Sequence, residues 1–144
     1  MNLLGSKTLT TERLLLKSSK MAEQKRLWEI LMIPSVNKWY LVGAKKHAGD
    51  PTHWAWETQE RFYESKVAQA DNKDTFVWSV FLKGQYTCSG HEEVIGQVSA
   101  QRREEDITIR DVGWYIDPNY QKKGYATEAA KAMIDYMFKD VEIN

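Results

Sequence analysis

The sequence predicts an α/β protein with a mixed, mostly antiparallel sheet flanked by helices. Apolar segments at residues 75–82, 94–101 and 107–116 are separated by polar turns, which is typical of an antiparallel meander. Amphipathic helical spacing occurs before these strands, at residues 21–32, and again after them, at residues 126–138. The length of 144 residues suits one domain, so residues 1–144 are taken as a single unit.

The order of elements begins with a strand predicted over residues 10–17. A helix is expected over residues 21–32, with Ser19 as its N-cap and Pro34 ending it, because proline cannot continue a helix. Periodicity places one apolar stripe on the buried face of this helix. The residues of that stripe are Leu27, Ile30 and Leu31.

A second helix is expected after an irregular segment, residues 36–49, which we interpret as a loop over a groove. Asp50 suits the N-cap and Pro51 the first helical position, and the helix should end near residue 71. One face of this helix is apolar. It carries Trp56, Tyr63, Val67 and Ala70.

The most informative stretch is a strand, a glycine-containing loop and a helix in direct succession, residues 112–138. The first N–H groups of a helix have no internal partner, and the helix dipole adds positive potential there. Gly124 has no Cβ, so a ligand can approach its backbone, and Lys122 and Lys123 add positive charge. The sequence therefore predicts a cradle for phosphate or pyrophosphate. The apolar face of the helix carries Ala126, Ala129, Ala130, Met133, Ile134 and Met137.

Composition excludes few function classes but narrows the setting. With 20 basic and 20 acidic residues the formal net charge is zero, which does not suggest a nucleic-acid partner. No apolar run approaches the length of a membrane span, and the first residues lack the features of a signal peptide. The one cysteine, Cys88, favours a reducing, cytoplasmic compartment. Cys88 and His91 are too few ligands for a metal site, so no metal is expected.

Two motifs resemble a known family. The pattern Gln-x-x-Gly-x-Ala at residues 121–126 follows Gly-Trp-Tyr-Ile-Asp-Pro at residues 113–118, and together they resemble the acetyl-coenzyme A loop of GNAT N-acetyltransferases. Gly-Tyr-Ala-Thr-Glu-Ala at residues 124–129 and Thr-Glu-Arg-Leu-x-Leu at residues 11–16 are most similar to the branch that includes the ribosomal-protein N-acetyltransferases. The resemblance implies a GNAT-like acyl-CoA N-acyltransferase fold, acetyl-CoA as co-substrate and a primary amine as acceptor.

The resemblance also assigns roles to the backbone. It implies that the strand ending at Ile116 splays from its neighbour and binds the pantetheine arm, with an N–H near Ile116 polarising the thioester carbonyl. It implies that amides of residues 122–127 hold the pyrophosphate. The expected cofactor-binding residues are Trp114, Tyr115, Ile116, Gln121, Lys122, Lys123, Gly124, Tyr125, Ala126 and Thr127.

The general base is predicted to be Asp111, which shares a strand face with Gly113 and Tyr115 and could take the amine proton directly or through water. The alternative for Asp111 is a strand-end aspartate paired with Arg110. Glu92 and Glu93 are alternative bases, although a polar turn explains both. No general acid is assigned, because the family residue would lie beyond the end of this sequence.

Family members continue past the cradle helix with further strands, so the sequence predicts a C-terminally shortened domain in which these strands are missing, either because the protein is a shortened homologue or because the sequence is a piece of a longer reading frame. Two functions follow: an N-acetyltransferase acting on a protein N-terminus or a small-molecule amine, or an acyl-CoA binding module with little or no catalytic activity. The strand over residues 107–116 would keep an unpaired edge. A homodimer is therefore expected, with residues 139–144 or this edge strand at or near the contact.

Overall fold

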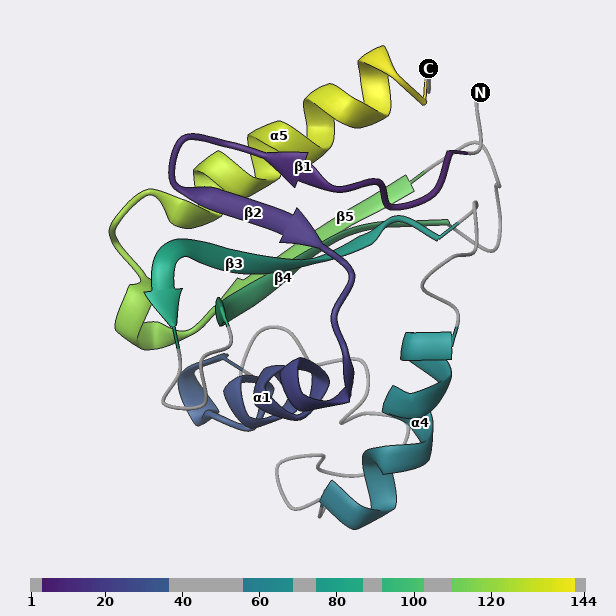
Figure 1. Ribbon diagram of the computed structural model, residues 1–144, viewed down its shortest axis with the longest axis vertical. Coiled ribbons are helices and arrows are strands. Elements are labelled where there is room, and N and C mark those ends of the chain that lie inside the picture. Colours follow the sequence, from purple (N-terminus) through teal and green to yellow (C-terminus); the bar gives the residue numbers. More distant parts are fainter. Residues whose placement is uncertain (1–3, 37–55, 69–74, 87–91, 103–109, 142–144) are drawn as a thin grey trace.

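The computed structural model describes residues 4–36, 56–68, 75–86, 92–102 and 110–141 (Figure 1). The predicted loop beyond residue 36 and the expected helix start at Asp50 and Pro51 lie outside these residues. The elements are β1 (Leu9–Thr10), β2 (Leu14–Lys17), α1 (Met21–Leu31), α4 (Trp56–Ala68), β3 (Val77–Tyr86), β4 (Glu92–Arg102), β5 (Arg110–Ile116), the 3₁₀ turn η2 (Pro118–Tyr120) and α5 (Tyr125–Lys139).

One antiparallel sheet organises the fold. Its strand order is β1-β2-β3-β4-β5, the same as the order in the chain, and every neighbouring pair is antiparallel. The predicted meander and fold class are therefore confirmed. In the described part of the chain β5 is an edge strand, paired on one side only.

The prediction of one strand over residues 10–17 is wrong, because the chain reverses direction between β1 and β2. Thr11 closes the turn: its backbone N–H donates to the Leu14 carbonyl at 3.0 Å, and its hydroxyl oxygen accepts from the Leu14 N–H at 2.9 Å. A threonine side chain that bonds nearby backbone favours a turn over a continuous strand. The turn brings Arg13 to the surface, where it becomes important below.

Helix α1 agrees with the prediction, and its expected stripe of Leu27, Ile30 and Leu31 is buried. The cap is one residue later than expected, at Lys20. The Lys20 backbone N–H donates to the Glu23 carboxylate at 3.2 Å, as in half of a capping box. The hydroxyl of Ser19, the predicted cap, instead accepts a hydrogen bond from the Gln24 amide at 2.6 Å.

Helices cover both faces of the sheet (Figure 1). Helix α5 covers one face, where the buried core includes Trp78, Val98 and Met133. Helix α1 covers the other, where Leu27 and Ile30 pack with further buried residues of the sheet. Helix α4 packs against α1 through aromatic side chains, with the rings of Trp28 and Trp56 5.5 Å apart and those of Trp56 and Tyr63 also 5.5 Å apart.

The central hairpin is longer than predicted. Strand β3 continues to Tyr86 and β4 begins at Glu92, so the polar turn expected over residues 83–93 is mostly strand. Strand β4 also contains a bulge, because Val80 pairs with Gly96 while the next residue of β3 pairs with Val94. The additional residue is Ile95, which is buried with Val80 in the core under α5, while Val94 is buried with Phe81 in the core beside α1.

Helix α5 uses most of its predicted apolar face. Ala129, Ala130, Met133 and Met137 are buried, and Ala126 is half-buried. Ile134 is the exception, since 37% of it is exposed. Tyr136 is buried as well, and its hydroxyl donates to the Gly5 carbonyl at 2.7 Å. The helix is therefore fastened to the N-terminal segment as well as to the sheet.

Candidate functional site

Strands β4 and β5 pack tightly where Gly96 pairs with Ile116. A Cβ on Gly96 would lie 2.2 Å from the Tyr115 carbonyl oxygen and 3.0 Å from the Ile116 Cα, so only glycine fits without movement of the backbone. Gly96 was not singled out from the sequence. Its role depends on which residue lies opposite in the sheet, and only the register reveals that.

Alternation along β5 distributes its side chains between two faces. Tyr115 is buried in the core beside α1, and Asp111 and Gly113 share its face of the strand. Trp114 pairs with Val98 and lies on the α5 face, with 49% of the residue exposed. The unpaired edge of β5 therefore carries backbone hydrogen-bonding groups next to a half-exposed tryptophan.

A cleft of about 480 Å³ lies along this strand. It joins the C-terminal half of β5 to the segment after α1 and to the first turn of α5. The cleft brings together five of the predicted cofactor-binding residues, and Ser35 and Val36 as lining that the sequence did not indicate. The predicted residues that line it are Trp114, Tyr115, Ile116, Gln121 and Ala126. The other five, Lys122, Lys123, Gly124, Tyr125 and Thr127, lie on the adjoining loop and helix turn.

The loop after β5 is fixed by side chains that bond to its backbone. Asp117 is fully buried, and its carboxylate accepts a hydrogen bond from the Asn119 N–H at 2.9 Å and an ion pair from Arg26 of α1. The Gln121 side-chain amide donates to the Ile116 carbonyl at 3.0 Å. This bond holds the end of β5 against the start of the loop, so the conformation there is determined before any ligand arrives.

The N-terminus of α5 has the properties of an anion site. Gly124 is the N-cap, with φ of 82°, and no side chain caps the helix. Lys122 also has a positive φ, of 63°, and Lys123 between them does not. Successive residues of opposite handedness turn their N–H groups to one side and form a concave nest for anions. The nest and the uncapped helix turn can together hold phosphate oxygens.

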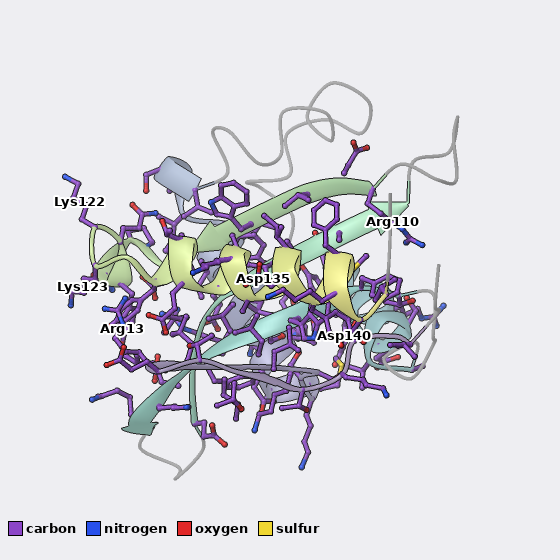
Figure 2. All side chains as sticks on the ribbon, turned by 90° about the horizontal axis from the view of Figure 1, so that it is seen from above. Arg13, Arg110, Lys122, Lys123, Asp135 and Asp140 are labelled. Atoms are coloured by element: carbon purple, nitrogen blue, oxygen red, sulfur yellow. The ribbon has the colours of Figure 1, made fainter. Side chains whose placement is uncertain are left out.

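Arg13 lies beside this nest, which no pattern in the sequence indicated. Figure 2 shows Arg13, Lys122 and Lys123 together at one end of α5, with Arg110 toward the other end. The Arg13 Nε donates to Glu128 Oε1 at 2.7 Å, and the Arg13 Nη1 donates to the Lys123 carbonyl at 2.8 Å. The N-terminal turn thus contributes to the surroundings of the loop.

Glu128 is the centre of that contact. Burial alone raises the pKa of the Glu128 carboxyl, but hydrogen bonds from Thr11 and Arg13 outweigh it and the pKa lies below its ordinary value. The carboxylate accepts from the Thr11 hydroxyl and, at 3.0 Å, from the Arg13 backbone N–H. Glu128 is therefore ionised at neutral pH, and it fastens the β1–β2 turn to the first turns of α5.

The candidate bases lie apart from the cleft lining. Asp111 is exposed near the start of β5 opposite Gln101, and the lining begins at the next residue, Val112. Glu92 forms an ion pair with Lys17 at 3.0 Å, which gives it a structural role. The structure places Asp111 on the expected face, and its role in proton transfer stays a prediction.

Metal sites and membrane-spanning helices are considered for the described residues. Among the residues that the structure describes, no group of three or more His, Cys, Asp or Glu side chains could hold a metal ion, and Cys88 and His91 lie outside them. Within the same ranges, no helix is both long and apolar enough to span a bilayer.

Comparison with known proteins shows to which class of protein this architecture belongs. The family described as acetyltransferase (GNAT) domain matches residues 13–144, and the chain belongs to this family. The predicted enzyme class, an acetyltransferase, is confirmed, and the GNAT family uses acetyl-CoA as its acetyl donor.

Individual relatives are distant. The uncharacterized N-acetyltransferase YnaD of Bacillus subtilis is 26% identical over 136 residues, which are 94% of this chain and 68% of the relative. A GNAT-family acetyltransferase from Bacillus anthracis has a TM-score of 0.67 at 22% identity, covering 95% of this chain and 69% of the other. Ribosomal-protein-S5-alanine acetyltransferase from Vibrio fischeri has a TM-score of 0.63 at 20% identity, covering 96% and 70%. At these identities the two solved structures show the fold alone.

Proposed function

We propose that this chain transfers an acetyl group from acetyl-CoA to a primary amine, either a protein N-terminus or a small-molecule amine. The observation that carries the proposal is the continuity of the cleft along β5 with the uncapped N-terminus of α5. One end accepts phosphate groups and the other offers an unpaired strand edge, which suits a long ligand with an anionic head. The single cysteine supports action in the cytoplasm.

The residues fit the donor in two parts. Backbone N–H groups of residues 122–127 would hold the pyrophosphate. The loop forms a concave nest, no side chain caps the helix, and Lys122 and Lys123 add positive charge. The edge of β5 near Trp114, Tyr115 and Ile116 would bind the pantetheine arm through backbone hydrogen bonds, with Gln121 and Ala126 completing the wall. When bound, acetyl-CoA supplies an activated thioester as the acetyl source.

The chain's own contribution to the chemistry is orientation and proton transfer. A backbone N–H near Ile116 would stabilise negative charge on the thioester carbonyl oxygen. Asp111 would accept the proton of the attacking amine, through water if the amine lies in the cleft, since Asp111 stands just outside the lining. The acceptor would enter from the side of α1 and Ser35, where the cleft meets the other sheet face.

The purified chain should convert acetyl-CoA in the presence of at least one member of an amine panel, measured by release of free thiol. Asp111→Asn should lower kcat by about a hundredfold, since a positioned base contributes about that much. Glu92→Gln is the matched control, because Glu92 is paired with Lys17, and it should keep the rate. Binding of coenzyme A without turnover of any amine would contradict the enzyme proposal and favour the acyl-CoA binding module.

We also propose a homodimer. Val112 and Trp114 on β5 and Ile134 and Phe138 on α5 are large apolar residues that are 45%, 49%, 37% and 57% exposed. Exposed apolar groups next to an unpaired strand edge favour association with another chain. The contact would involve these exposed side chains on the α5 side of β5, with residues 139–144 or the Val112 end of β5 at or near it, and it would leave the backbone edge near Ile116 to the pantetheine arm.

Sedimentation velocity at micromolar concentration should show a dimer for the unmodified chain. Phe138→Asp should give a monomer, because it introduces a charge at the most exposed of these apolar residues. Lys131→Asp, which also changes an exposed position of α5, should leave the dimer intact. A monodisperse monomer of the unmodified chain that unfolds cooperatively would refute the dimer.

A further inference from the structure

The turn between β1 and β2 contacts the loop before α5, residues 121–124, although the two are far apart in the sequence. Arg13 and the Lys123 carbonyl are 110 residues apart and joined by a hydrogen bond of 2.8 Å. Arg13 and Glu128 are joined through both the guanidinium and the backbone of Arg13. Arg13 can have one of two roles: it can hold α5 against the β1–β2 turn, or it can form part of the binding site for the acetyl donor.

The donors of Arg13 are only partly used. Nε bonds Glu128 and Nη1 bonds the Lys123 carbonyl, whereas Nη2 has no hydrogen bond among the described residues. Nη2 lies 3.2 Å from the position of a Cβ on Gly124, and the guanidinium carbon lies 4.5 Å from the centre of the Tyr125 ring. These contacts fix the guanidinium beside the first residue of α5. Since 41% of the side chain is exposed, its outer edge remains accessible.

The bond to Lys123 has an effect on the loop itself. A carbonyl that pointed into an anion site would repel phosphate, and Arg13 takes this carbonyl as its acceptor. The bond also supports a loop in which Lys122 has φ of 63°, a conformation that disfavours residues with a Cβ. A purely structural contact between the β1–β2 turn and α5 would need only the bonds to Glu128. The additional bond to the Lys123 carbonyl and the unused Nη2 therefore favour a role for Arg13 in binding acetyl-CoA.

The charge of Glu128 does not cancel this role. Both of its carboxylate oxygens are occupied on the inner side, Oε1 by the Arg13 Nε and Oε2 by the Thr11 hydroxyl and the Arg13 backbone. The carboxylate thereby bonds the β1–β2 turn, while Nη2 of Arg13 lies beside Gly124. Arginine donors arranged in a rigid fork suit phosphate oxygens.

We propose that Arg13 is a phosphate-binding residue of the donor site, oriented by Glu128 and Thr11, which also keeps the Lys123 carbonyl out of the nest. The inference rests on the proposed function, because it takes coenzyme A as the ligand of this site. It adds to that function a residue from the N-terminal turn, with the phosphates of coenzyme A as the groups it recognises.

Isothermal titration calorimetry with coenzyme A, and with pantetheine as the ligand that lacks phosphates, tests the inference. Arg13→Ala should weaken coenzyme A binding by about ten- to a hundredfold, the range expected for a hydrogen bond to a charged group. Pantetheine binding should not change. Lys17→Ala is the matched control, because Lys17 lies on β2, the strand that follows Arg13, is also paired with a glutamate and is similarly exposed at 33%. It should leave both affinities unchanged.

Arg13→Lys and Thr11→Val extend the test if Arg13→Ala lowers the melting temperature. Lysine keeps the charge but cannot bond Glu128, Lys123 and a phosphate at once. The affinity of Arg13→Lys for coenzyme A should therefore fall between that of the unmodified chain and that of Arg13→Ala. Thr11→Val removes one bond to Glu128 without a change of charge. It should lower the affinity for coenzyme A less than Arg13→Ala does.

The outcomes separate this inference from the proposed function. An unmodified chain that does not bind coenzyme A would overturn the proposed function. Binding by the unmodified chain with equal affinity in Arg13→Ala would overturn the role of Arg13 alone. Equal losses for coenzyme A and pantetheine would also overturn it, because a purely structural contact affects both ligands whereas a phosphate-binding residue affects one.

Discussion

Gly96→Ala should destabilise the protein by about 3 kcal/mol, the upper range for forcing an additional carbon into a packed interior. The added Cβ would lie 2.2 Å from the Tyr115 carbonyl oxygen, which is backbone and cannot rotate aside. Relief requires β4 and β5 to separate where Gly96 pairs with Ile116, so the cleft would change shape as well. Urea unfolding followed by far-UV circular dichroism gives the free energy of unfolding.

Gly84→Ala is the matched control for this prediction. Gly84 has φ of 77°, but a Cβ there would meet no atom within 4 Å, so the substitution strains the backbone without a clash. Its cost should be about 1 kcal/mol, the cost of the left-handed region for a residue with a Cβ. Equal losses of stability in the two variants would show that the close approach of β4 and β5 is absent in solution.

Gly124→Glu should abolish measurable binding of coenzyme A while the protein stays folded. Three effects act together: strain at φ of 82°, a Cβ placed 3.2 Å from the Arg13 Nη2, and a carboxylate where the phosphates would bind. The new carboxylate would also attract Arg13 away from its position. Calorimetry with coenzyme A measures the loss, and circular dichroism shows that the exposed loop tolerates the change.

Lys122→Ala and Lys123→Ala should lower the affinity for coenzyme A much less than Gly124→Glu does. Both lysines are exposed, and exposed charges are screened by salt, whereas the backbone of the nest would contact the ligand directly. If Gly124→Glu binds coenzyme A as well as the unmodified chain, the assignment of the pyrophosphate to residues 122–127 is refuted.

Local patterns sufficed to predict most of the elements. Alternation and turns indicated the antiparallel sheet, and helical spacing indicated α1 and α5 with most of their buried residues. The loop was located because its signal, a strand followed by glycine and a helix, is contained in a short stretch of sequence. The residues that line the cleft from β5 were found for the same reason.

Contacts between distant parts of the chain could not be predicted in this way. No feature near Arg13 indicates that it bonds the Lys123 carbonyl, and none near Gly96 indicates that it pairs with Ile116. The β1–β2 turn was missed because apolar residues continue through it, while its reversal depends on the side chain of Thr11. Such errors arise where tertiary contacts override the local pattern.

The fastening of α5 to the N-terminal segment has a consequence for how the protein acquires its site. Tyr136 bonds Gly5 across 131 residues, and Glu128 bonds Thr11 across 117, so the chain must be present through α5 before these contacts form. Closing so long a loop costs entropy before any contact compensates for it, which favours late formation during folding. On the ribosome, a partly synthesised chain would therefore have most of its sheet but not the finished phosphate loop. Binding competence would then follow the synthesis of α5 and not that of the sheet alone.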